Sequence, residues 1–148
     1  MPPRQRRIVQ AILYETFGVA FISPALSFVF EESLASTIVL SVLVSALALG
    51  WNYAFNFFFE NWERHQTVKG RSWKRRLAHG LGFEGGLALM LVPLTAWWLE
   101  ISLLEAIFTE ASIVAFFFVY AVMFTWTFDR VFGLPESALD NPIQPKSD

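Results

Sequence analysis

The sequence contains no cysteine, which excludes disulfide frameworks, thiolate metal sites and cysteine nucleophiles. Its only two histidines, His65 and His79, are not spaced with acids in the way that metal ligands are. It also lacks a phosphate-binding glycine loop and any nucleophile motif. These absences argue against an enzyme and predict neither a cofactor nor a metal site.

Charged residues are scarce as well, at 16% of the 148 residues, whereas soluble domains average about 25%. Hydrophobic residues make up 55% of the chain and aromatic residues 17%. Four apolar stretches, at about 8–30, 36–59, 77–99 and 103–128, exceed the roughly 20 residues that cross a bilayer. Because they do not alternate as barrel strands do, they predict four transmembrane helices.

The basic residues predict the orientation of these helices. All 11 are found in three places: the N-terminus (Arg4, Arg6, Arg7), the middle loop (Arg64, Lys69, Arg71, Lys74, Arg75, Arg76) and the C-terminal tail (Arg130, Lys146). The short turns at 31–35 and 100–102 contain none. By the positive-inside rule, both termini and the middle loop are cytoplasmic. Anionic lipid headgroups explain the basic loop without nucleic acid.

The sequence repeats itself at a fixed offset of 69 residues, without gaps. The repeat pairs Arg7, Tyr14, Glu15, Pro24, Trp51, Phe55, Phe59 and Glu60 with Arg76, Phe83, Glu84, Pro93, Tyr120, Phe124, Phe128 and Asp129. Each half therefore carries a carboxylate within an apolar stretch. Charge in lipid is costly and usually marks a substrate or ion pathway, so the duplicated acid indicates transport.

The repeat predicts an all-α integral membrane protein of four transmembrane helices, arranged as two parallel-repeat helical hairpins with both termini inside. The first hairpin covers residues 1–60 and the second covers 76–130. Residues 61–75 form a cytoplasmic linker and residues 131–148 a cytoplasmic tail. Each hairpin crosses the membrane twice, so both hairpins point the same way.

Glu15 and Glu84 are the first candidates for proton and substrate coupling. No basic residue lies in the same apolar run, and burial disfavours the charged form of a carboxyl group. Such a group can exchange a proton for a cation, or it can stay protonated and bond neighbouring helices together. Gly82 and Gly86 flank Glu84 and allow close helix packing, which predicts that the third helix is the packed one and that Glu15 is freer to face a cavity.

Further candidates lie on the second and fourth helices. Two lines of residues at i, i+4 and i+8 spacing run along the second helix, a polar line (Asn52, Asn56, Glu60) and an aromatic line (Trp51, Phe55, Phe59). They bind a bulky organic cation or pack between helices, and the sequence leaves both open. Glu110, whose counterpart is Ser41, is a candidate second proton site. The predicted substrate pathway comprises Tyr14, Trp51, Asn52, Phe55, Asn56, Glu60, Tyr120 and Asp129. Arg7 and Arg76 anchor their helices, or form a gate with Glu60 or Asp129.

Four motifs resemble those of a known family. Arg7-x-x-Gln10-Ala11-x-x-Tyr14-Glu15 and Arg76-x-x-His79-Gly80-x-x-Phe83-Glu84 are similar to the first- and third-helix motifs of the proteobacterial antimicrobial compound efflux family. Trp51-Asn52-x-x-Phe55-Asn56-x-x-Phe59-Glu60 and Tyr120-x-x-x-Phe124-x-x-x-Phe128-Asp129 are similar to its second- and fourth-helix motifs. The resemblance covers nearly the whole chain up to about Arg130.

This resemblance implies a proton-driven exporter of the bacterial inner membrane. The implied substrates are cationic biocides, such as chlorhexidine and acriflavine, and short-chain diamines. It maps the family's essential first-helix glutamate onto Glu15 and a fourth-helix acid onto Glu110. Gln10 departs from the motif, which often has histidine there. A homodimer is expected because four helices leave little room for a pathway. The alternative is a non-transporting membrane scaffold whose buried acids hold its helices together.

Overall fold

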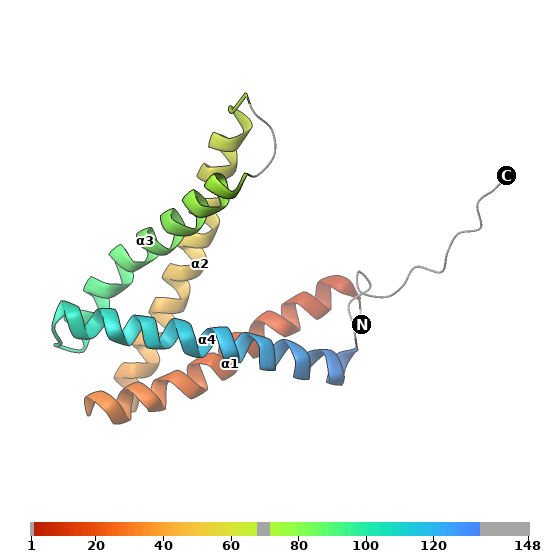
Figure 1. Ribbon diagram of the computed structural model, residues 1–148. Coiled ribbons are helices and arrows are strands. Elements are labelled where there is room, and N and C mark those ends of the chain that lie inside the picture. The colour runs from red at the N-terminus through yellow and green to blue at the C-terminus, as the bar shows by residue number, and fades with distance from the viewer. Residues whose placement is uncertain (1, 68–71, 134–148) are drawn as a thin grey trace. The chain divides into compact units, whose positions relative to one another are not determined.

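The computed structural model describes residues 2–67 and 72–133, which form four helices (Figure 1). All four are long and apolar enough to cross a membrane, which confirms the all-α prediction. The expected tail at 131–148 lies, from residue 134 onward, outside the described residues. The helices are α1 (Pro3–Phe30), α2 (Leu34–Arg64), α3 (Trp73–Trp98) and α4 (Leu103–Phe132).

All four helices extend beyond their apolar stretches at one end or both. α2 continues beyond Phe59 to Arg64, and α3 begins at Trp73, ahead of the expected start at Leu77. Both ends lie within the expected linker at 61–75. Helical hydrogen bonding does not depend on hydrophobicity, so a helix continues through polar residues until a cap ends it. Ser72 provides such a cap for α3, because its side chain accepts a hydrogen bond from the Arg75 amide.

The turns between α1 and α2 and between α3 and α4 have the same backbone geometry. Glu31 and Glu100, which are 69 residues apart, both adopt the left-handed region with φ of 53°. Ser33 follows the first turn and caps α2. Ser102 follows the second and exchanges hydrogen bonds with Glu105 over 2.9 and 3.2 Å, as a capping box does. In both turns, a residue with positive φ follows the first helix and a serine caps the second.

The chain divides into two compact units. The terminal unit comprises Met1–Gly18 and Ala115–Asp148, and the central unit comprises Val19–Val114. Each unit therefore combines residues from both sequence repeats. In the central unit, α2 and α3 lie side by side (Figure 1).

Packed side chains fill the central unit near the two turns, a region that we call the turn end. Leu26, Leu40 and Leu99 form its buried apolar core. Polar side chains also join the helices there. Thr37 of α2 donates to the Ser23 carbonyl of α1 over 2.8 Å, and Trp98 of α3 donates to Ser36 of α2 over 3.0 Å. Hydrogen bonds of this kind hold membrane helices together where water is absent.

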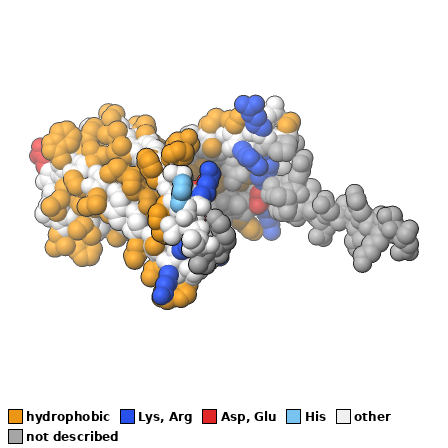
Figure 2. Space-filling view, turned by 90° about the horizontal axis from the view of Figure 1, so that it is seen from above, with side chains coloured by type: hydrophobic (Ala, Val, Ile, Leu, Met, Phe, Trp, Pro, Cys, Tyr) orange, Lys and Arg blue, Asp and Glu red, His pale blue; other side chains and the backbone are white. Residues whose placement is uncertain are grey.

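The outer surface is largely apolar. Phe28 is 87% exposed, Leu89 is 79% exposed and Trp97 is 73% exposed. Figure 2 shows hydrophobic side chains over much of the visible face. A water-soluble protein rarely exposes so many large apolar side chains together, whereas lipid accommodates them.

Candidate functional site

Glu15 is half-buried on α1 in the terminal unit and follows Tyr14, whose ring packs among aromatic side chains of α4. The Tyr14 ring is 4.8 Å from the Tyr120 ring and 5.2 Å from the Phe124 ring, measured between centroids. The Tyr120 hydroxyl donates to the Tyr14 carbonyl over 2.9 Å. The Glu15 carboxyl is close enough to both phenols to interact with them electrostatically. The candidate acid therefore lies next along the helix to an aromatic cluster contributed by α1 and α4 and interacts electrostatically with its two phenols.

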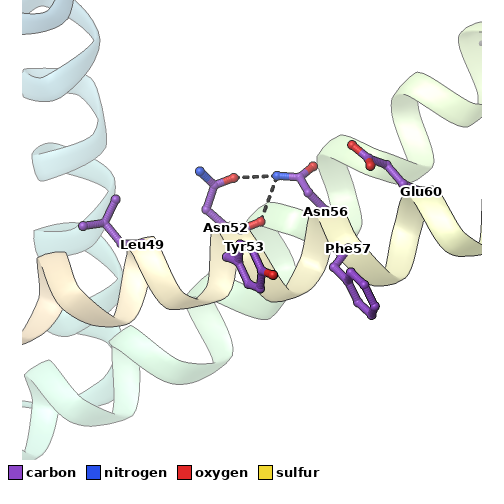
Figure 3. A pocket seen from close by; sticks show the side chains of 6 residues that line it. All are labelled: Leu49, Asn52, Tyr53, Asn56, Phe57 and Glu60. Carbon is purple, nitrogen blue, oxygen red and sulfur yellow. Dashed lines mark hydrogen bonds between the residues drawn. The ribbon is translucent and has the colours of Figure 1, made fainter. Parts of the chain in front are cut away.

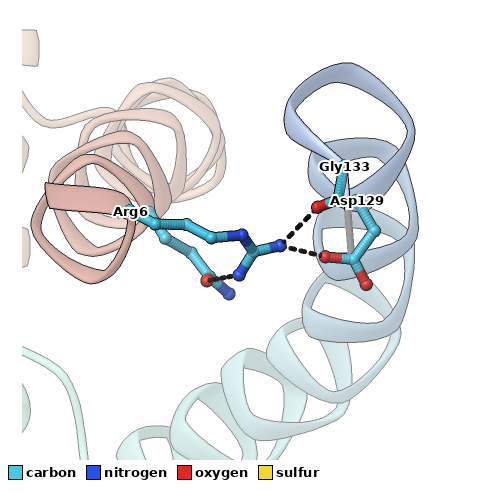
Figure 4. Close-up of polar contacts among 4 residues, drawn as sticks. Arg6, Asp129 and Gly133 are labelled. Atoms are coloured by element: carbon cyan, nitrogen blue, oxygen red, sulfur yellow. Dashed lines mark hydrogen bonds and ion pairs between the residues drawn. The ribbon is translucent and has the colours of Figure 1, made fainter. Parts of the chain in front are cut away.

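Asp129 of α4 is paired with Arg6 of α1 (Figure 4). Arg6 also donates to the Gly133 carbonyl over 2.9 Å and to Gln10 over 3.3 Å, and its guanidinium lies 5.0 Å from the Phe128 ring centroid. Arg7, for which the sequence predicts either an anchoring or a gating role, is exposed. Adjacent helix residues differ by about 100° in direction, so only one of the two arginines can face α4.

Arg6→Gln is expected to destabilise the protein far more than Arg7→Gln. The Arg6 side chain is only 11% exposed, and its loss leaves Asp129 without its counter-ion. Removing one partner of a mostly buried ion pair costs up to about 3 kcal/mol. Thermal unfolding of both variants in detergent checks this, since each loses one positive charge at the same helix end. Equal unfolding temperatures would show that the pair contributes nothing.

The aromatic line of α2 packs against the glycine-rich face of α3. The Trp51 indole N–H donates to the Phe83 carbonyl over 2.9 Å. An added Cβ at Gly86 would lie 2.1 Å from the Trp51 ring, and one at Gly82 would lie 3.1 Å from the Phe55 ring. The close approach expected at these glycines is therefore confirmed, and it occurs within one copy of the chain.

The polar line of α2 lines a hollow of about 380 Å³ in the central unit (Figure 3). Asn56 donates to both the side-chain oxygen and the carbonyl of Asn52, and Glu60 lies one turn further along. A carboxylate, amide oxygens and aromatic rings are the groups that bind an ammonium ion. The lining residues are Leu49, Asn52, Tyr53, Asn56, Phe57 and Glu60.

The other two candidate acids occupy contrasting positions in the central unit. Glu84 is exposed on α3. Glu110 of α4 is buried, with 9% of its surface exposed, and accepts a hydrogen bond from Thr95 of α3 over 2.6 Å. Its counterpart Ser41 is equally buried and bonds Ser23. Ser41 and Glu110 thus both form a hydrogen bond to the neighbouring helix, but only Glu110 has a carboxyl group.

Thr95→Val is expected to destabilise the turn end by about 1–3 kcal/mol, because it removes the donor to a buried carboxyl group and keeps the side-chain shape. Thr16→Val is the matched control. Thr16 is exposed on α1 and donates to the carbonyl of Ile12 in its own helix. Denaturation of the two variants under identical conditions gives the comparison. A Thr16→Val effect as large as that of Thr95→Val would contradict a role for the Glu110 contact.

Comparison with known proteins identifies the family. A family model described as chlorhexidine efflux transporter matches the chain twice, over residues 2–65 and 71–134. The two ranges start 69 residues apart, as the repeat predicts. The chain belongs to this family. It is therefore a transporter of the proteobacterial antimicrobial compound efflux family, with two such domains in tandem, and not an enzyme.

Similar proteins carry a more specific name. Three bacterial proteins, each named short-chain diamines transporter, match 86% of this chain. The protein from Vibrio parahaemolyticus is 36% identical over 91% of its own length. Those from Acinetobacter baylyi and Acinetobacter baumannii are 35% and 32% identical over 89% and 88% of theirs. No solved structure matches the chain.

The structure adds residues that sequence reasoning missed. Tyr53 and Phe57 lie one position after the two asparagines and share their side of α2. Thr95 reaches Glu110 from another helix, so no local pattern could reveal it. Arg6 differs from Arg7 only in direction. The signal that could have revealed Arg6 is Asp129 itself, because an acid within a membrane helix usually pairs with a basic residue of a neighbouring helix.

Proposed function

We propose that this family member exports organic cations in exchange for protons across the bacterial inner membrane. Both termini lie in the cytoplasm, as the distribution of basic residues supports. Its substrates are cationic biocides of the chlorhexidine and acriflavine type and short-chain diamines. The family description and the names of the three relatives support this substrate class.

The observation that carries the proposal is a half-buried carboxyl group, Glu15, in a helix that can span the membrane, where it interacts electrostatically with the Tyr14 and Tyr120 phenols. Facing the cytoplasm, the deprotonated carboxylate binds a cationic group, and the aromatic cluster of Tyr14 and Tyr120 attracts positive charge. Facing outward, it takes a proton and releases the cation. The protonated side chain then returns and gives the proton to the cytoplasm. One carboxyl group thus couples the two fluxes because proton and cation compete for it.

In this proposal, the other candidate acids have roles that differ from that of Glu15. The α2 hollow, with Glu60 beside Asn52 and Asn56, takes an ammonium group from the cytoplasm. Glu84 serves as the acid of the second repeat, and Glu110 as an internal proton site. Asp129 contributes only when it separates from Arg6, since the ion pair already neutralises it.

Purified protein in liposomes tests the proposal. We would follow uptake of a dye with a fixed positive charge, because such a dye cannot enter passively as a neutral base. With an acidic interior, outward proton flow is expected to drive dye uptake well above that of protein-free liposomes. Unlabelled diamine should compete, and a neutral diol of the same length should not. Dye uptake that ignores the proton gradient would contradict the proposal.

A further inference from the structure

Two hydrogen bonds in the structure repeat one pattern at matched positions. In the terminal unit, the Tyr120 hydroxyl of α4 donates to the Tyr14 carbonyl of α1 over 2.9 Å. In the central unit, the Trp51 indole N–H of α2 donates to the Phe83 carbonyl of α3, also over 2.9 Å. Trp51 corresponds to Tyr120 and Tyr14 corresponds to Phe83, each 69 residues apart.

Both acceptors immediately precede a candidate acid. Tyr14 is followed by Glu15, and Phe83 is followed by Glu84. Both donors also belong to the opposite repeat: α4 holds the backbone of α1, and α2 holds the backbone of α3. Each repeat therefore contacts the other's acid-bearing helix one residue before the acid.

A side hydrogen bond to a helix carbonyl limits rotation of that helix about its axis. Successive residues differ by about 100°, so fixing the direction of residue 14 also fixes that of residue 15. Ring packing adds to this restraint, with Tyr14 4.8 Å from Tyr120 and Phe83 5.7 Å from Phe55. The same restraint thus acts one residue before Glu15 in one unit and one residue before Glu84 in the other.

We propose that Tyr120 and Trp51 are positioning residues, each of which orients the acid of the other repeat. Tyr120 acts on Glu15 and Trp51 on Glu84. The inference rests on the proposed proton-coupled export. In the central unit the wide indole of Trp51 fits because it packs against Gly86, where an added Cβ would meet the ring.

A purely structural reading is that each donor only satisfies its own hydrogen-bonding need in an apolar region. Tyr120→Phe separates the two readings. This substitution removes only the hydroxyl donor. The Tyr14 carbonyl, which accepts the hydrogen bond that the structure shows, keeps its intrahelical partner, so the structural reading predicts unchanged transport.

The test measures the rate and pH profile of dye transport in liposomes for the wild type, Tyr120→Phe, Trp51→Phe and Trp51→Tyr. Tyr120→Phe is expected to lower the maximal rate about fivefold, the factor that one net hydrogen bond represents, and to shift the pH profile. Trp51→Phe should also lower the rate. Trp51→Tyr should restore most of it, because a phenol serves as donor at the matched position of the other repeat.

Wild-type rates and pH profiles in both phenylalanine variants would overturn the inference, as would equal rates for Trp51→Tyr and Trp51→Phe. If the wild type itself shows no proton-driven uptake, the proposed function fails. That result differs from the two outcomes above, in which the wild type transports and only the variants are compared.

The lack of cysteine allows a second measurement that does not depend on transport. Thr16→Cys and Leu13→Cys place thiols on an exposed and a half-buried side of α1. With Tyr120 intact, the two positions should react with a membrane-permeant maleimide at clearly different rates, because their surroundings differ. In the Tyr120→Phe background, rotation of α1 should bring the two labelling rates closer together. An unchanged ratio would contradict a positioning role.

Discussion

Glu15→Gln is expected to abolish proton-driven export while the protein still folds and inserts. Glutamine keeps the size and hydrogen bonding of the side chain but can neither bind a proton nor attract a cation by charge. A charge-assisted contact of up to about 3 kcal/mol corresponds to a loss on the order of 100-fold. Dye uptake in liposomes at several pH values measures the loss.

Two variants make this result interpretable. Glu31→Gln removes a carboxylate from an exposed turn and should transport like the wild type. Glu84→Gln removes the matched acid of the second repeat, and a smaller loss than that of Glu15→Gln is expected because Glu84 is exposed. Retained, pH-dependent uptake by Glu15→Gln would refute the mechanism.

Gly86→Ala is expected to be the most destabilising small substitution between α2 and α3. Its Cβ would lie 2.1 Å from Cζ2 of Trp51, a distance that real atoms do not adopt, so the indole or the helix must move. Overpacking of this kind costs about 1–3 kcal/mol. Moving the indole also breaks its hydrogen bond to Phe83. Thermal unfolding in detergent measures the effect.

Gly85→Ala is the matched control, since nothing lies within 4 Å of the position where its Cβ would be. Alanine favours a helix over glycine by up to about 1 kcal/mol, so this variant should be as stable as the wild type or more so. Combining Gly86→Ala with Trp51→Phe should recover part of the loss, because a smaller ring leaves room. Equal stability of the two alanine variants would contradict the packing of α2 on α3.

The sequence was informative where a signal lies within one helix. Four apolar stretches predicted the four helices, and the Gly82 and Gly86 spacing predicted a packed face. Helix ends were missed because polar residues end a hydropathic stretch without ending a helix. α2 thus continues to Arg64.

What the sequence could not predict is which side chains meet across helices. Whether Arg6 or Arg7 faces Asp129 depends on the rotation of α1, which packing with α4 decides. From their residue types alone, Trp51 and Phe55 could either bind a cation or pack between helices. The structure places both side chains against α3.

The measurement that tests the central claim most directly follows pH inside liposomes that contain the protein. The liposomes are loaded with a substrate of fixed positive charge and a pH dye, with no initial pH gradient and with the membrane voltage clamped. As the cation leaves down its gradient, antiport predicts that protons enter and the interior acidifies, in the wild type and not in Glu15→Gln. Cation efflux without acidification would contradict proton exchange and indicate a passive pathway.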